Sequence, residues 1–157
     1  MVTFQEAYVP LQKQFKLPSY NELNEEFELL YISQIAAIDF PLRFVRRRIL
    51  DKINVSCNFF QAILQPNPNS LISMREASFY SKDNKEVMFD LLKECMQLSR
   101  SSLLLETKSS NNDEAEYIKS ALKLWNKIRP EYTKFARKLS DGWMKKEVKK
   151  EKESYFN

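Results

Sequence analysis

The stretch DFPLRFVRRRILDKINVSCNFFQAIL, residues 39–64, is the longest run in the chain that has a helix start, an apolar row and a stop. Asp39 is a suitable N-cap residue, and Pro41 fits a first turn, where its missing N–H is not needed. Apolar residues recur at spacings of three and four, which is typical of one face of an α-helix. They are Leu42, Val45, Ile49, Ile53, Cys57, Phe60 and Leu64. Pro66 and Pro68 then predict the end of the helix.

The other side of this predicted helix is basic. Arg43, Arg47 and Asp51 lie opposite the apolar row, and Arg46, Arg48 and Lys52 lie on its flanks. Two interpretations of these cations remain open. In the first, the side chains of Arg43, Arg46, Arg47, Arg48 and Lys52 bind phosphates of RNA or DNA together with the basic C-terminal helix. In the second, they pair with an acidic helix nearer the N-terminus and hold it against the bundle, which contributes little to binding.

The chain before residue 39 begins with a segment, residues 1–18, that is rich in apolar side chains but shows no sustained period. Because Pro10 and Pro18 interrupt it, we expect an extended arm packed on the bundle. Ser19 and Glu22 form the sequence pattern of a capping box, which predicts a short helix from about residue 20 to residue 27. The acidic residues Glu22, Glu25, Glu26 and Glu28 give this helix a solvated, negatively charged face.

Three further helices are expected after residue 69. Ser70 caps the first, Ser81 or Asp83 caps a second over about residues 84–105, and the third runs from Asp113 to Trp143. The polar run at residues 106–112 is expected to be a flexible loop. Pro130 is expected to kink the last helix or to split it. Residues 145–157 have almost no apolar face, so we expect a solvated, fraying tail.

Length and composition favour one domain. The chain has 157 residues, of which 43% are hydrophobic, and this is enough for a substantial core. It contains one glycine, Gly142, whereas hairpins and βα turns usually need residues at positive φ. We therefore predict an all-α fold in a single domain over residues 1–157, a helical bundle of four main helices plus a short N-terminal helix and an extended N-terminal arm.

The residues that enzymes use most are scarce. The chain has no histidine, which removes the commonest general base near neutral pH and the commonest transition-metal ligand. A single glycine excludes a phosphate-binding loop or a GxGxxG turn. Cys57 and Cys95 lie in apolar rows without CxxC spacing, so we expect buried free thiols. These patterns predict a protein that is not an enzyme and has no catalytic, cofactor-binding or metal-binding residues.

The chain also lacks recognisable targeting signals. No stretch approaches the roughly 18 apolar residues that a transmembrane helix requires. The N-terminus does not have the charged-then-apolar layout of a signal peptide. We therefore expect a cytoplasmic protein that does not bind membranes.

Both ends of the chain resemble those of a known group. The segments FKLPSYNELNEEFE, residues 15–28, and EKESYFN, residues 151–157, are similar to the ends of small uncharacterised all-helical proteins from archaea. The resemblance covers only these ends, and it implies no activity.

The functional prediction is a non-catalytic helical module for protein–protein interaction or assembly. Its acidic short helix and the aromatic groups near the C-terminus are candidates for docking a partner or a second copy. The candidate docking residues are Glu22, Glu25, Glu26, Trp143, Tyr155 and Phe156. The alternative is a nucleic-acid-associated protein that uses the arginine-rich face.

Overall fold

The structure, a computed structural model, describes residues 2–31 and 38–145. These residues form helices and connecting turns, and none of them lies in a β-strand. The elements, in chain order, are α1 (Phe4–Phe15), α2 (Tyr20–Phe27), the 3-10 turn η1 (Leu29–Tyr31), α4 (Pro41–Leu64), α5 (Leu71–Ser78), α6 (Lys82–Thr107) and α7 (Asn111–Met144). The predicted all-α bundle is confirmed.

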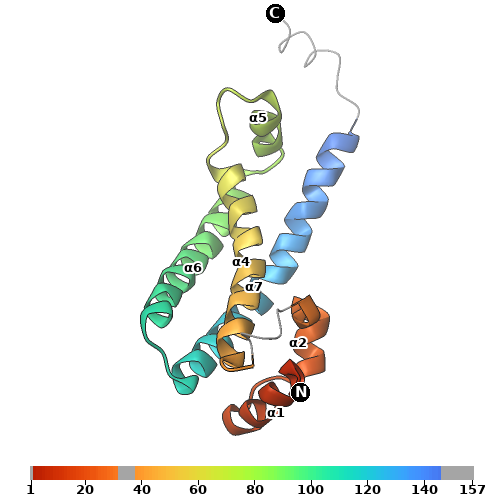
Figure 1. Cartoon of the computed structure of the whole chain (residues 1–157). Coiled ribbons are helices and arrows are strands. Elements are labelled where there is room, and N and C mark those ends of the chain that lie inside the picture. Colours follow the sequence, from red (N-terminus) through yellow and green to blue (C-terminus); the bar gives the residue numbers. More distant parts are fainter. Residues whose placement is uncertain (1, 32–37, 146–157) are drawn as a thin grey trace, which may run out of the picture.

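Three long helices make the body of the molecule. Figure 1 shows α4, α6 and α7 running side by side, and α4 packs against both of the others. The pair α1 and α2 lies beside the N-terminal half of α4, whereas α5 lies at the opposite end, near the C-terminal end of α7. The core is continuous, because one cluster of buried residues includes side chains from α1, α2, α4, α6 and α7.

The apolar row of α4 forms the centre of this core. Leu42, Val45, Ile49, Ile53 and Phe60 are all fully buried. The predicted N-cap is wrong, because α4 begins at Pro41 with Phe40 as its N-cap and no side-chain capping bond. Asp39 lies one residue too early to cap this turn, whereas the fixed φ of Pro41 suits the first helical position.

The predicted extended arm is also wrong, because residues 4–15 form α1. Thr3 and Glu6 make a capping box at its start, a local pattern that apolar periodicity does not reveal. A proline inside a helix costs about 3 kcal/mol, and Pro10 lies inside α1. Burial of a large apolar side chain contributes about 1.5–3 kcal/mol. Phe4 and Tyr8 are both buried, so docking of α1 offsets the cost of Pro10.

The loop predicted at residues 106–112 is mostly helical. Helix α6 continues to Thr107, and α7 begins at Asn111, with Ser110 and Asp113 forming its capping box. Pro130 does not split α7, which runs without a break from residue 111 to residue 144. Buried side chains on both sides of the proline, Ile128 and Phe135, hold the two halves against the same core. The connection between α6 and α7 is therefore a tight turn.

The two cysteines lie in the core, as predicted. Cys57 on α4 and Cys95 on α6 are free thiols and are buried. A hydrogen bond between the two thiols and burial raise the pKa of Cys95, and the same hydrogen bond lowers the pKa of Cys57. This contact ties the middle of α4 to the middle of α6.

Candidate interaction surface

Arg46 lies inside the bundle and not on its surface. Its side chain has no exposed area, although the sequence analysis places it on the flank of α4. Its position explains the difference, because residue 46 follows Leu42 by four and precedes Ile49 by three, so it shares the spacing of the apolar row. The guanidinium group of Arg46 donates to Glu114 on α7, with a distance of 2.6 Å from Nε to Oε2. It also donates to Glu106 on α6, at 2.9 Å.

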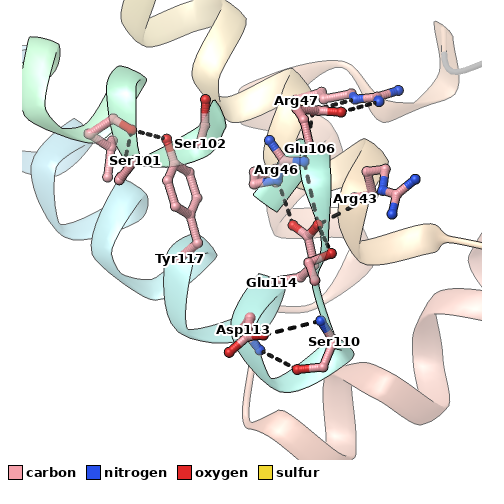
Figure 2. A network of polar contacts seen from close by, with 12 residues as sticks. Arg43, Arg46, Arg47, Ser101, Ser102, Glu106, Ser110, Asp113, Glu114 and Tyr117 are labelled. Atoms are coloured by element: carbon pink, nitrogen blue, oxygen red, sulfur yellow. Dashed lines mark hydrogen bonds and ion pairs between the residues drawn. The ribbon is translucent and has the colours of Figure 1, made fainter. Parts of the chain in front are cut away.

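Two more arginines surround these glutamates, as Figure 2 shows. Arg47 donates through two nitrogen atoms to the two carboxylate oxygens of Glu106, at 3.1 and 2.7 Å. The Nε atom of Arg43 lies 4.0 Å from Glu114 and is buried without a hydrogen bond to any described residue. Ser109 donates to the Glu114 carboxylate at 2.9 Å. Three arginines of α4 thus face two glutamates at the turn between α6 and α7.

This network fixes the charge state of Glu106. Hydrogen bonds from Arg47 and Arg46 lower the pKa of Glu106 from its ordinary value of 4.5 to about 2. Glu114 lies in the first turns of α7, where the helix dipole favours a negative charge. Arg46 is buried and its bonds go to these two carboxylates, so it offers little to an external phosphate. Arg47 bonds to Glu106 through two nitrogen atoms and keeps a side chain that is 43% exposed.

Arg48 and Lys52 hold α2 against α4. Arg48 donates to the carbonyl oxygens of Phe27 and Glu28, and the Lys52 ammonium donates to the carbonyl oxygen of Glu26. These carbonyls belong to the C-terminal turn of α2, which lacks a basic residue of its own. Cations beside the C-terminus of a helix are favoured by its dipole. The contacts of Arg48 and Lys52 are therefore directed mainly at the backbone of α2.

The predicted acidic docking residues lie on α2 in three different environments. Glu22 completes the predicted capping box with Ser19, and these hydrogen bonds lower its pKa. Glu25 is exposed to solvent. Glu26 reaches across to α7, where it accepts from the Trp125 indole at 2.7 Å and from Arg129 at 3.2 Å. Of these three acids, Glu26 contributes most to holding α2 in place.

The predicted aromatic docking residue Trp143 lies at the α5 end of the bundle. Its side chain is half exposed, its ring packs edge-on against Phe79, and its indole N–H donates to Glu76 of α5 at 3.1 Å. The neighbouring Gly142 has no side chain, and a Cβ atom there would lie 2.5 Å from the Phe79 ring. Trp143 thus helps to attach α5 to α7. The other two predicted residues, Tyr155 and Phe156, lie outside the described residues, as does most of the predicted tail.

Sequence analysis missed a further surface on α6. This helix buries Met88, Leu91 and Cys95 in the core, yet it also exposes large apolar side chains. They are Val87, Phe89, Leu103 and Leu104, with exposed fractions of 40, 52, 58 and 71%. A helical wheel of residues 82–107 would have shown apolar side chains on more than one face, which is unusual for a helix that covers one side of a core.

A groove between α6 and α7 lies beside this apolar surface. It has a volume of about 830 Å³. On the α6 side it is lined by Glu94, Gln97, Leu98, Ser101, Leu104 and Leu105, and on the α7 side by Asp113, Glu116, Tyr117, Ser120, Lys123, Leu124 and Lys127. The Lys127 ammonium bonds to Glu94 across one end, at 2.8 Å. None of the lining residues comes from α1, α2, α4 or α5, so the groove is open on its outer side.

The described residues contain neither a cluster for a metal ion nor a membrane-spanning helix. Residues 2–31 and 38–145 contain no cluster of three or more acidic or cysteine side chains suited to a metal ion. Within the same ranges, every helix is too short or too polar to cross a membrane. Comparisons with family models, with curated proteins and with solved structures gave no match.

Proposed function

We propose that this protein is a helical interaction module that binds another protein through the outer apolar side of α6. The observation that supports the proposal is the exposure of Phe89, Leu103 and Leu104 on a helix that already buries a core face. Leu103 and Leu104 are adjacent on α6, and Phe89 lies about 21 Å from Leu103 along the same helix. Exposed apolar side chains that gather on one side of a small bundle are typical of a protein-binding site. We also propose that this module has no catalytic activity.

The arrangement of charges supports protein binding over phosphate binding. Arg46, Arg47, Arg48 and Lys52 all have partners inside the molecule, on α2, α6 or α7. A phosphate-binding surface needs cations that are free to replace counterions around a nucleic acid. Four of the five basic residues of α4 that the sequence singled out thus make internal hydrogen bonds. The fifth, Arg43, lies 4.0 Å from Glu114, and its Nε atom has no hydrogen bond to a described residue.

The proposal is tested by affinity purification of the tagged full-length chain from cells that produce it naturally, followed by mass spectrometry. The triple variant Phe89→Lys, Leu103→Lys, Leu104→Lys changes only exposed positions, so we expect it to fold but to lose its partner. Val55 of α4 is as exposed as Leu103, at 58%, so Val55→Lys is the matched control for the single variant Leu103→Lys. A partner retained equally by the triple variant and by wild type would contradict a role for α6.

The alternative function, binding of RNA or DNA, has its own test. Fluorescence anisotropy with a single-stranded RNA and with a DNA duplex measures affinity as the salt concentration rises. Binding at low salt that falls steeply with added salt would favour the alternative, because phosphate contacts release counterions. Arg47 belongs to the arginine-rich face and its side chain is 43% exposed, so Arg47→Ala is better suited to this test than a change at Arg46, whose removal would disturb the core.

A further inference from the structure

The three long helices leave grooves between them, and the chain itself fills one. Helix α2 lies against both α4 and α7, where Arg48 and Lys52 of α4 and Trp125 and Arg129 of α7 contact it. Its apolar residues, Leu23 and Phe27, are buried in this position. This packing shows that the bundle accepts a short amphipathic helix across a pair of its long helices.

The groove between α6 and α7 has the features that a second such helix requires. Its residues recur at spacings of three and four on each helix, with Leu98, Ser101 and Leu105 on α6 and Tyr117, Ser120 and Leu124 on α7. Two serines in the middle leave room for a backbone to approach closely. The span from residue 94 to residue 105 corresponds to about 17 Å at 1.5 Å per residue, or about three helical turns.

Charge distinguishes the two ends of this groove. Asp113 and Glu116 lie at the end beside the α6–α7 turn, where Glu116 also pairs with Lys119 at 3.1 Å. Lys123 and Lys127 lie at the other end, where Lys127 pairs with Glu94 at 2.8 Å. The C-terminus of α6 and the N-terminus of α7 meet at the acidic end, so their opposite dipoles largely cancel there. The polarity of the groove therefore comes from its side chains, with Asp113 at one end and Lys123 at the other lying outside these two ion pairs.

We propose that the α6–α7 groove binds one amphipathic helix of about three turns from a partner protein. The apolar face of that helix rests on the leucines of the groove. Its basic end lies beside Asp113 and Glu116, and its acidic end lies beside Lys123 and Lys127. The inference rests on the proposed interaction function and identifies the surface and the partner chemistry. Bound in this way, the partner helix adds a short further helix to the bundle, on the outer side of α6 and α7.

The test uses two synthetic 18-residue peptides of identical composition as probes. Both carry leucines at positions 4, 8, 11 and 15; one has two lysines at its first end and two glutamates at its other end, and the second has these charges mixed at both ends. We expect the first peptide to bind the full chain with a dissociation constant below about 100 µM, as is reasonable for a small interface. We expect the mixed-charge peptide to bind at least about threefold more weakly, because its charges do not match the ends of the groove.

Two serine variants locate the binding site. Ser120→Trp fills the floor of the groove and is expected to weaken binding of the first peptide at least about tenfold. Ser140→Trp places the same side chain at an exposed position of α7 outside the groove lining and is expected to leave binding unchanged. Circular dichroism of both variants verifies that they remain helical. Equal binding by Ser120→Trp and wild type, or equal binding of the two peptides, would overturn the inference.

The outcome also separates this inference from the broader function. If neither peptide binds, but the tagged chain retains a partner that the α6 triple variant loses, the groove is not the docking site and the interaction function stands. If neither peptide binds and no partner depends on α6, both proposals fail.

Discussion

Arg46 carries a permanent charge at a position without solvent contact, and its glutamate partners explain how the fold accommodates it. Burying a guanidinium group is costly unless opposite charges and hydrogen-bond acceptors surround it. Glu114 and Glu106 supply both, from two helices that meet at a tight turn. The network therefore connects α4 to the turn between α6 and α7 and specifies where this end of α4 lies.

The first prediction concerns removal of this buried charge. Arg46→Ala is expected to lower the free energy of unfolding by about 3–5 kcal/mol, because Glu114 then remains buried without its main partner. The double variant Arg46→Met, Glu114→Leu removes both charges, so its free energy of unfolding should fall clearly less than that of Arg46→Ala. Guanidinium chloride unfolding measures both values. A loss below about 1 kcal/mol for Arg46→Ala would show that the pair does not lie in the interior as described.

The second prediction concerns acid. The pKa of Glu106 is about 2 in the folded chain and 4.5 ordinarily, so the unfolded chain binds a proton more readily between these values. The contribution of Glu106 to stability is full above pH 4.5 and is lost as the pH falls towards 2. Because Glu106 is partly exposed, solvent screening reduces this contribution. The midpoint temperature of thermal unfolding between pH 6 and pH 2 should depend less on pH in Glu106→Gln than in wild type. The control Glu86→Gln, at an exposed position of the same helix, should leave this pH dependence unchanged.

At the scale of elements, α5 depends on the end of α7 for its position. This helix has eight residues and buries only Ala77, so its own packing is weak. Phe79, directly after α5, packs on Trp143, and Gly142 provides the space for the Phe79 ring. The single glycine of the chain thus serves a close approach between two elements, and not a turn.

A substitution at Gly142 tests this contact. In a helix interior the exchange of glycine for alanine typically stabilises by up to about 1 kcal/mol. Here the added methyl group would meet the Phe79 ring, so we expect Gly142→Ala to lower stability by about 1 kcal/mol or more. In a Phe79→Ala background the ring is absent, and the same exchange should raise stability. Chemical unfolding of wild type, the two single variants and the double variant gives the sign of the stability change in each background. A gain in stability from Gly142→Ala in both backgrounds would contradict the close approach of Gly142 and Phe79.

At the scale of the whole molecule, one continuous core predicts one cooperative unit. Buried residues of α1, α2, α4, α6 and α7 belong to the same cluster, and the Tyr80 hydroxyl joins the segment after α5 to the Phe135 carbonyl of α7 at 2.7 Å. Unfolding by denaturant should therefore follow a single transition. Trp125 lies within the bundle and Trp143 at its end. The unfolding transitions followed by tryptophan fluorescence and by circular dichroism at 222 nm should therefore coincide. Different midpoints for the two transitions would indicate that parts of the bundle unfold independently.

The sequence by itself determined the helical class and most helix positions. Apolar spacing in residues 42–60, the capping patterns at Ser19, Ser70 and Ser81, and the shortage of glycine are local signals, and they act through backbone geometry within a few residues. The sequence predicts an arm over residues 1–18, because Pro10 and Pro18 are strong local signals against a helix, yet residues 4–15 form α1. Burial of Phe4 and Tyr8 against other elements outweighs it.

Only the tertiary structure decided which charges are available to a partner. The sequence predicts that an arginine is exposed, because burial of its charge is favourable only where acidic side chains lie next to it. These acids can come from distant parts of the chain, as they do for Arg46. Glu106 and Glu114 are 60 and 68 residues away from Arg46. The open groove likewise exists because α6 and α7 lie side by side and no described part of the chain covers their outer seam. Such long-range pairings depend on how whole helices pack, and the local spacing of residues does not encode them.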